Sequence, residues 1–264
     1  MINVNALTGD LERVREKSPL IHNITNYVVM NNTANALLSI GASPVMAHAV
    51  EEVADMVQLA SALVINIGTL SREWVEAMIV AGQTACRKGI PVVLDPVGAG
   101  ATAYRTNVCR QLVEICKPTI IRGNASEIMS LVNSGIATKG VDSADSSDAA
   151  IDSAKALALA ANAVVVVSGP TDYITDGQQL EVVKNGNPMM ARVTGLGCTA
   201  TAVTAAFAAV NSDALQAAAH GMAVMSIAGE RAASKAVGNG SMQVLFLDEL
   251  YNLDAETIRK TIRL

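Results

Sequence analysis

Short, largely apolar runs recur along the chain without alternation of polar and apolar positions. The clearest runs cover residues 63–67, 92–95, 119–122 and 164–168, and a weaker one covers residues 44–47. Strands of a parallel sheet that is covered by helices on both faces show this continuous apolar pattern. We therefore expect these runs to form buried parallel strands.

The segments between these runs have the spacing of helices. In residues 34–38 apolar side chains recur at i, i+3 and i+4, and Gly41 follows where a helix C-cap is expected. Further helices are predicted over residues 73–88 and 148–161, and the polar stretch 138–147 predicts a surface loop. Alternating strands and helices predict an α/β fold with a doubly wound, mostly parallel sheet and right-handed crossovers.

The pattern changes in the second half of the chain. Two short β-rich runs, 172–175 and 179–183, flank the dipeptide Asp176-Gly177, which is typical of a tight hairpin turn. The sheet should therefore carry an antiparallel edge hairpin. No linker or internal repeat divides the sequence, so residues 1–264 are predicted to form a single domain.

Composition narrows the class of protein. Hydrophobic residues make up 51% of the chain but aromatic residues only 3%, so the core must consist mainly of aliphatic side chains and Ala. A net charge of −5 argues against a nucleic-acid partner. No signal-peptide pattern begins the chain, no apolar run approaches the ~18 residues of a membrane span, and the cysteines form no CxxC pair. We therefore expect a cytoplasmic protein with reduced thiols and no membrane partner.

A two-glycine turn is the most informative local motif. Thr194-Gly195-Leu196-Gly197-Cys198-Thr199 lies between a β-rich run at 190–193 and an Ala-rich run at 200–210, which predicts a strand, a turn and a helix. The first N–H groups of a helix have no internal partner and, with the helix dipole, form an anion site that most often binds phosphate. The two glycines leave room for a ligand, and Cys198 lies at the mouth of the predicted site.

Two carboxylates are candidates for binding Mg²⁺, which prefers oxygen ligands. Asp95 ends a predicted buried strand, at the edge of the sheet where ligands bind. Pro96 follows it, so a strand-end turn is the alternative. Glu127, in Asn124-Ala125-Ser126-Glu127, would help to organise metal-bound water at a helix start. The same spacing also fits a capping box, and the two roles of Glu127 do not exclude each other.

Other predicted strands place polar residues at the same edge of the sheet, namely Asn66, Arg122 and Ser168. An arginine at this edge can clamp phosphates, although a surface ion pair is the alternative for Arg122. A cluster of Asn and Thr residues ending at Asn26 would line a substrate pocket through amide hydrogen bonds. A capped loop is the alternative for this cluster.

Other nucleotide-binding motifs are incomplete in this chain. Gly98-Ala99-Gly100 is only a fragment of the dinucleotide fingerprint, because no acidic residue lies about 20 positions further on. Gly197-Cys198-Thr199 lacks the lysine of the Walker motif. A kinase without that lysine must stabilise the transferred phosphoryl group through backbone donors, metal and arginine.

Four segments accompany the glycine turn: Ile21-His22-Asn23-Ile24-Thr25-Asn26, Pro44-Val45-Met46-Ala47-His48-Ala49, Leu94-Asp95-Pro96-Val97-Gly98-Ala99-Gly100 and Ile121-Arg122-Gly123-Asn124-Ala125-Ser126-Glu127. Together these motifs resemble the hydroxyethylthiazole kinase family of the ribokinase-like superfamily. The resemblance covers nearly the whole chain. In most members of the superfamily an aspartate, taken to be the base, stands at the position of Cys198.

The resemblance implies a kinase that uses ATP and Mg²⁺ to phosphorylate the primary alcohol of 4-methyl-5-(2-hydroxyethyl)thiazole, a step of thiamine salvage. It also implies a homotrimer with active sites between subunits. The family often has Thr where this chain has Ser168, which keeps the hydroxyl group. The motifs and the resemblance together assign catalysis to Cys198, ATP binding to Arg122, Ser168 and Gly197, thiazole binding to Met46, Gly195 and Asn26, and Mg²⁺ binding to Asp95 and Glu127.

The chemistry expected of Cys198 depends on opposing effects. A helix N-terminus can lower the pKa of a thiol below its free value, but neighbouring phosphates raise it again. We therefore expect Cys198 to be a proton acceptor of modest strength. The backbone amides beside it are expected to contribute more to the rate, because they can receive the charge that develops on the transferred group.

Two other functions stay open at this point. One is another ribokinase-like activity, such as a hydroxymethylpyrimidine kinase or a nucleotide-dependent hydrate dehydratase, which would be expected to carry Asp in place of Cys198. The other is a non-catalytic sensor of nucleotide or thiazole on the same fold, which the presence of Asp95, Glu127 and Arg122 argues against. Fold alone does not separate these functions, whereas an assay of ATP consumption with small heterocyclic alcohols does.

Overall fold

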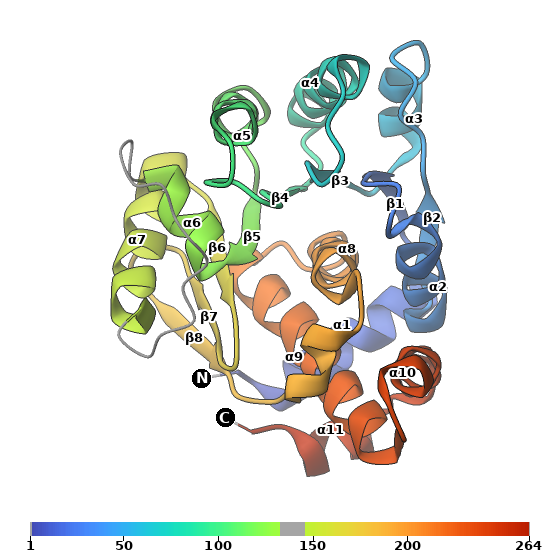
Figure 1. Ribbon diagram of the computed structural model, residues 1–264. Coiled ribbons are helices and arrows are strands. Elements are labelled where there is room, and N and C mark those ends of the chain that lie inside the picture. The colour runs from blue at the N-terminus through green and yellow to red at the C-terminus, as the bar shows by residue number, and fades with distance from the viewer. Residues whose placement is uncertain (1, 133–145, 264) are drawn as a thin grey trace.

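The structure, a computed structural model, describes residues 2–132 and 146–263. Within these residues one sheet contains β1 (Leu20–Ile24), β2 (Ser43–Val45), β3 (Ala62–Asn66), β4 (Val92–Asp95), β5 (Ile120–Asn124), β6 (Val164–Ser168), β7 (Asp172–Thr175) and β8 (Leu180–Val183). The order of the strands across the sheet is β2-β1-β3-β4-β5-β6-β7-β8 (Figure 1).

The direction of the strands follows the predicted topology. Neighbouring strands from β2 to β6 run parallel, whereas β6 with β7 and β7 with β8 form antiparallel pairs. Gly177 lies in the turn between β7 and β8 with a φ of 95°, a backbone conformation that favours glycine. The mostly parallel α/β sheet with an antiparallel edge hairpin is therefore confirmed.

Helices cover both faces of the sheet (Figure 1). In the described residues they are α1 (Val4–Lys17), α2 (Met30–Ile40), α3 (Val53–Leu59), α4 (Arg72–Lys88), α5 (Ala103–Cys116), α6 (Ala125–Val132), α7 (Ser146–Ala161), the 3-10 helix η1 (Pro188–Arg192), α8 (Leu196–Ala208), α9 (Ala214–Lys235), α10 (Asn239–Asn252) and α11 (Ala255–Thr261). Consecutive residues of β3 alternate between two apolar cores, with Val64 in one and Leu63 and Ile65 in the other. Burial of both faces explains why the strands are apolar without alternation.

The three helices predicted from the sequence correspond to α2, α4 and α7. Gly41 follows α2 with a φ of 92°, as expected of a glycine that ends a helix. Of the predicted surface loop 138–147, residues 138–145 lie outside the described residues, and α7 begins at Ser146. No helix in the described part of the chain is both long enough and apolar enough to cross a membrane.

Strand β1 was not expected, because the polar residues around His22 point to a loop or a pocket lining. The structure instead places β1 between β2 and β3, with His22 and Asn23 buried. The ring Nε2 of His22 lies 2.8 Å from the carbonyl oxygen of Ala47, and the Asn23 amide donates to the carbonyl of Ile21 at 2.8 Å. These contacts satisfy one polar atom of each side chain, whereas His22 Nδ1 and Asn23 Oδ1 are buried without a hydrogen-bond partner among the described residues.

The strand expected at residues 190–193 is wrong. This segment belongs to η1, which begins with Pro188 and is capped by Asn187, whose side chain accepts from the Met189 N–H at 2.9 Å. Proline is well suited to the first turn of a helix, and the side-chain cap stabilises that turn. Helix α8 also begins at Leu196 rather than near residue 200.

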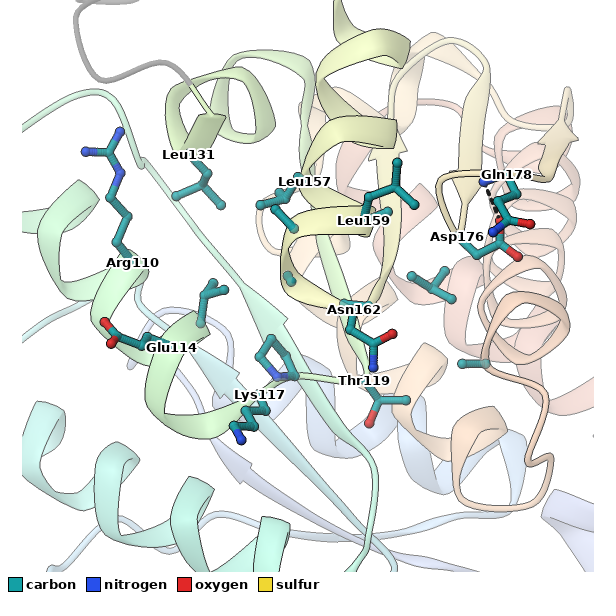
Figure 2. Close-up of a pocket in the computed structure, with 18 residues that line it drawn as sticks. Arg110, Glu114, Lys117, Thr119, Leu131, Leu157, Leu159, Asn162, Asp176 and Gln178 are labelled. Carbon is teal, nitrogen blue, oxygen red and sulfur yellow. Dashed lines mark hydrogen bonds between the residues drawn. The ribbon is translucent and has the colours of Figure 1, made fainter.

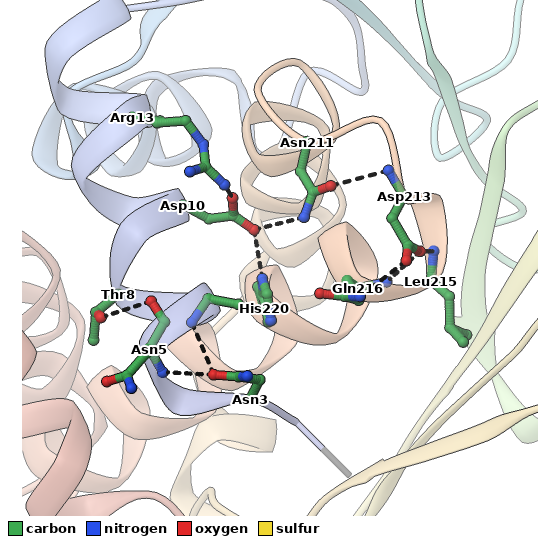
Figure 3. A network of polar contacts seen from close by, with 11 residues as sticks. Asn3, Asn5, Thr8, Asp10, Arg13, Asn211, Asp213, Leu215, Gln216 and His220 are labelled. Carbon is green, nitrogen blue, oxygen red and sulfur yellow. Dashed lines mark hydrogen bonds and ion pairs between the residues drawn. The ribbon is translucent and has the colours of Figure 1, made fainter.

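A buried polar network joins α1 to α9 on the face away from α4 (Figure 3). The carboxylate of Asp10, fully buried in α1, lies 2.5 Å from Nδ1 of His220 in α9. Asn211 donates to the same carboxylate at 2.7 Å, and Arg13 forms an ion pair with it. The network satisfies a carboxylate that would otherwise be costly to bury.

Candidate active site

Parallel pairing brings the carboxyl ends of several strands to one edge of the sheet. Asn66 at the end of β3 is in register with Asp95 at the end of β4. Asn124 at the end of β5 is likewise in register with Ser168 at the end of β6. The N-terminal part of α8 lies at the same edge, because Thr201, in its second turn, donates a hydrogen bond to Asp95.

A chain of hydrogen bonds runs from the loop after β1 to β4. Asn26 Nδ2 donates to Asn66 Oδ1 at 2.9 Å, and Asn66 Nδ2 donates to Asp95 Oδ2 at 2.8 Å. The backbone N–H of Gly68 also donates to Asn66 Oδ1 at 2.9 Å. Since Asn66 Oδ1 accepts two N–H groups, its amide has one consistent orientation, with the nitrogen toward Asp95.

Cys198 lies in the first turn of α8 and contacts this chain. Asn26 Nδ2 donates to Cys198 Sγ at 3.4 Å. Burial and the charge of Asp95 raise the pKa of the Cys198 thiol to about 11, against the smaller opposing effects of Asn66, Asn26 and Arg122. The expected lowering of this pKa by the helix N-terminus is therefore not seen. The thiol is protonated at neutral pH.

The two glycines of the motif have different roles. Gly195 caps α8 with a φ of 85°, and a β-carbon there would lie 2.7 Å from Val29 Cγ1. Gly197 lies inside the first turn rather than in a preceding loop. The first backbone bond of α8 runs from the Thr199 N–H to the Gly195 carbonyl at 2.9 Å. The amide groups between these two residues precede that bond, so they have no partner within the helix.

Arg122 lies against this turn. It is only 9% exposed, and Nη2 donates to the hydroxyl of Ser168 at 2.7 Å. A β-carbon on Gly197 would lie 3.0 Å from Arg122 Nη1, so the glycine permits this close approach. Arg122 Nε is buried and has no hydrogen-bond partner among the described residues. A buried guanidinium with spare donors beside free helix amides suits an anion, and the surface ion pair considered from the sequence is wrong.

Glu127 forms the capping box that its spacing predicts. Its N–H donates to Asn124 Oδ1 at 2.9 Å, and its Oε2 accepts from the Asn124 N–H at 2.8 Å. Its Oε1 accepts from the backbone N–H of Gly98 at 2.8 Å. Glu127 therefore ties the start of α6 to the loop that follows Asp95.

Asp95 is the most deeply buried carboxylate of the cluster. Burial raises the pKa of Asp95 to about 6, with Arg122 acting in the opposite direction and Glu127 adding to the rise. Its hydrogen bonds from Asn66 and Thr201 both end on Oδ2, which leaves Oδ1 to a ligand. One free carboxylate oxygen and a second carboxylate nearby suit Mg²⁺, which usually binds one or two protein carboxylates and keeps several waters. In the described residues no group of three or more His, Cys, Asp or Glu side chains is arranged to hold a metal.

Met46 is the predicted site residue farthest from this cluster in the topology. It follows β2 at the edge of the sheet, so β1 and β3 lie between it and the strand of Asp95. The next residue, Ala47, is held by the imidazole of His22. The structure therefore brings together Asn26, Asp95, Arg122, Glu127, Ser168, Gly195, Gly197 and Cys198, whereas no hydrogen bond or ring contact connects Met46 to them in the described residues.

From the sequence, Asn66 is only a polar residue at a strand end, and Thr201 is not a candidate site residue. The position of Asn66 next to Asp95 depends on strand order, which the residues of either strand do not contain. Thr201 lies in an Ala-rich helix that shows no local sign of a contact with β4. Its position at the end of a strand is the one signal from which Asn66 could have been predicted as a site residue.

A surface cavity of about 990 Å³ lies elsewhere (Figure 2). Its lining includes Thr119 and Asn162, which come before β5 and β6, and Asp176 in the hairpin turn. These residues mark the amino ends of the parallel strands, opposite to the cluster around Asp95. The cavity therefore does not form part of the candidate active site.

Comparisons with known proteins agree with this arrangement. The hydroxyethylthiazole kinase family matches residues 11–256 of the chain. The chain belongs to the hydroxyethylthiazole kinase family. A protein of Leptospira biflexa with the name hydroxyethylthiazole kinase is 56% identical over 253 residues, which cover 96% of this chain and 95% of that protein.

Solved structures extend the comparison to the fold. The structure of a hydroxyethylthiazole kinase protein from Pyrococcus horikoshii has a TM-score of 0.91 and 42% identity, and the match covers 98% of each chain. A ribokinase-like superfamily protein from Enterococcus faecalis has a TM-score of 0.62 at 14% identity, with 89% of this chain and 88% of that chain covered. The second likeness concerns the fold alone, which is ribokinase-like in this hydroxyethylthiazole kinase family member.

Proposed function

We propose that this chain transfers the terminal phosphoryl group of ATP to the primary alcohol of hydroxyethylthiazole, as a cytoplasmic homotrimer built from single-domain subunits. Family membership supports the substrate. The observation that carries the chemistry is the packing of Arg122 against Gly197 at the start of α8, one residue before Cys198. A guanidinium, helix amides without a partner in the helix and the side chain of Cys198 thus lie close together, which supports a site for phosphoryl transfer.

The phosphate-binding part of the site consists of Arg122, Ser168 and the amide of Gly197. Phosphoryl transfer requires positioning and neutralisation of charge more than covalent participation by the protein. Helix amides that point at the transferred group need no reorganisation when negative charge develops on it. The partly unpaired guanidinium of Arg122 supplies the positive charge that a Walker lysine supplies in other kinases.

The metal-binding part consists of Asp95 and Glu127. Asp95 Oδ1 would be available to the metal ion, because Oδ2 already accepts two hydrogen bonds. Glu127 would help to organise metal-bound water, since each of its carboxylate oxygens already accepts a backbone N–H. A bound Mg²⁺ supplies neutralisation of phosphate charge at this edge of the sheet.

The acceptor side consists of Asn26, Met46, Gly195 and Cys198. With a protonated thiol, Cys198 contributes by holding the alcohol oxygen beside the helix amides rather than by acting as a strong base. In a loose transition state the alcohol loses its proton late, so the proton can pass to an oxygen of the transferred phosphoryl group and no strong protein base is required. The amide of Asn26, hydrogen-bonded to Sγ, fixes the position of the thiol.

Assembly into a trimer would complete the acceptor side. Tyr27 and Val28 follow Asn26 directly and are 64% and 66% exposed. Two adjacent, exposed apolar side chains next to a site residue are typical of a surface that a second subunit covers. The same loop would then contribute to a site between subunits.

A coupled assay of ATP consumption tests the proposal. The purified chain is incubated with Mg²⁺, ATP and a panel of alcohols that contains hydroxyethylthiazole, a hydroxymethylpyrimidine and pyridoxal. We expect turnover that depends on the thiazole alcohol and on Mg²⁺. Turnover of another alcohol in its place, or nucleotide binding without any turnover, would overturn the proposed substrate or the enzymatic function.

A further inference from the structure

A second buried carboxylate lies on the nucleotide side of the site. Asp172 begins β7 and is 5% exposed. Its Oδ1 accepts from the backbone N–H of Gly169 at 3.1 Å. Its Oδ2 accepts from the hydroxyl of Ser226, in α9, at 3.2 Å. Asp172 therefore joins the loop after β6 to α9, which packs on the same face of the sheet as α8.

The loop held by Asp172 leads directly to the phosphate-binding residues. Gly169 follows Ser168, whose hydroxyl accepts from Arg122 Nη2 at 2.7 Å and donates to the carbonyl of Gly123 at 3.2 Å. Movement of the Gly169 backbone would therefore displace the Ser168 hydroxyl and release one side of the Arg122 guanidinium. The path from Asp172 to Arg122 consists of two hydrogen bonds and one peptide unit.

Burial of the Asp172 carboxylate costs free energy, and a residue that only closed the hairpin would not require this burial. Burial raises the pKa of Asp172 to about 6, and the hydrogen bonds from Gly169 and Ser226 and the charge of Arg122 only partly offset this. The turn at the other end of the hairpin has an aspartate as well. Asp176 there accepts from the N–H groups of Gln178 and Gln179 at 2.8 and 2.7 Å. A hairpin turn can thus be capped by a partly exposed aspartate, without the penalty of a fully buried carboxylate.

We propose that Asp172 is a positioning residue for nucleotide binding, which holds Gly169 so that the Ser168 hydroxyl and the Arg122 guanidinium stay aligned toward the phosphates. The proposal rests on the proposed function in so far as that function makes ATP the phosphoryl donor. Asp172 acts through hydrogen bonds to Gly169 and Ser226 and does not touch the nucleotide itself.

Two substitutions separate hydrogen bonding from charge. Asp172→Ala removes both hydrogen bonds. Asp172→Asn keeps a carbonyl oxygen for the Gly169 N–H and an amide that can donate to the Ser226 hydroxyl, but removes the charge. Asp176→Ala is the matched control, because it loosens the same hairpin at its exposed end. Should the Ala variant not fold, Asp172→Ser, whose side chain is too short to reach both partners, takes its place.

Binding of ADP, measured by titration calorimetry, is the readout, with urea unfolding of each variant measured alongside. We expect Asp172→Ala to raise the Kd for ADP about tenfold, which corresponds to about 1.4 kcal/mol, and Asp172→Asn to stay within about threefold of the parent chain. The control should lower stability without changing the Kd. The KM for the thiazole alcohol should be the same in all variants.

Equal Kd values for the parent chain and Asp172→Ala would overturn the inference, as would an Asn variant that binds as poorly as the Ala variant. A control that weakens ADP binding as much as Asp172→Ala would show a merely structural role and overturn it too. A different result would contradict the proposed function without affecting the inference about Asp172. A parent chain that binds ADP but does not phosphorylate the thiazole alcohol would contradict the proposed substrate and leave the role of Asp172 standing.

Discussion

The side-chain amide of Asn66 donates to Asp95 at 2.8 Å while its carbonyl oxygen accepts from Asn26 at 2.9 Å. One asparagine thus connects the metal side of the site to the acceptor side. Asn26 follows β1 and Asp95 ends β4, and these two strands are not adjacent, so β3 between them is the element that can make this connection. The position of Asn66 at the end of β3 is therefore as important to the site as that of the candidate ligands.

Removal of this connection should slow the reaction. We expect Asn66→Ala to lower kcat/KM for the thiazole alcohol about 10- to 100-fold, because a hydrogen bond to a charged group contributes about 1.5–3 kcal/mol. Steady-state kinetics measure the effect. Asn252→Ala, at an exposed position in α10, is the control and should behave as the parent chain. Unchanged kcat/KM in Asn66→Ala would show that Asp95 and Asn26 do not depend on their shared partner.

Replacement of Cys198 should affect turnover only moderately. A thiol with a pKa of about 11 is neutral at pH 7 and contributes as a group that positions the alcohol. We expect Cys198→Ala to retain activity within about tenfold of the parent chain, since helix amides and arginine stabilise the transferred group. Cys198→Asp, with an ionised carboxylate, should keep or increase turnover.

The ionisation of Cys198 can be measured directly. The rate of alkylation by iodoacetamide should still rise above pH 9, because the thiolate is the reactive form and the raised pKa keeps it scarce at lower pH. A plateau of the rate near pH 7 would mean that the helix N-terminus dominates. Loss of turnover in Cys198→Asp, with fold and ATP affinity intact, would count against proton transfer at this position.

A side chain at Gly197 should impair nucleotide binding. A β-carbon there would lie 3.0 Å from Arg122 Nη1, and the larger Val must push the guanidinium away from the helix start. We expect Gly197→Val to raise the KM for ATP by at least about tenfold, since it displaces a charge-assisted contact. An enzyme unaffected by this change would exclude the start of α8 as the phosphate site.

A side chain at Gly195 should instead destabilise the fold. The residue has a φ of 85°, and a β-carbon would lie 2.7 Å from Val29 Cγ1. We expect Gly195→Ala to lower the free energy of unfolding by about 1–2 kcal/mol through the left-handed backbone alone, with the contact to Val29 adding to this. Urea titration measures the loss, and wild-type stability would show that α2 and α8 adjust without cost.

The network around Asp10 should control stability at acid pH. Burial by itself would raise the pKa of Asp10, but hydrogen bonds from His220 and Asn211 and the charges of His220 and Arg13 lower it overall. A folded pKa below the unfolded value of about 3.9 means that the stabilisation is present above about pH 4. It is lost as the pH falls through the lower, folded value.

Substitution of Asp10 tests this network. We expect Asp10→Ala to cost about 3–5 kcal/mol at pH 7, because it leaves a buried imidazole and amide without their partner. The difference from the parent chain should shrink as the pH falls below about 4, where the parent chain loses its own carboxylate. Thermal unfolding across this pH range measures both effects. Asp213→Ala, which removes the exposed N-cap of α9, is the control and should show no comparable loss.

Much of the fold can be predicted from the sequence, because the signals are local. Unbroken apolar runs predicted four of the inner strands, and Asp176-Gly177 predicted the hairpin. Glu127 is a similar case, since the capping box depends on residues only three positions apart. The glycine turn before α8 was also predicted from local residues, although the strand expected before it is the 3-10 helix η1. Its role as an anion site stays a prediction.

The other features of the fold and of the candidate site depend on tertiary structure. Strand β1 is polar at His22 and Asn23, and only contacts with Ala47 and the neighbouring strands make it an interior strand. The pKa of Cys198 depends on burial and on a carboxylate 103 positions away in the chain, at Asp95, so the local helix effect could not predict its direction. Local sequence therefore determined which elements form and which chemical groups end them. Strand order and burial determined which of those groups meet and what charge each one carries, because both depend on residues far apart in the sequence.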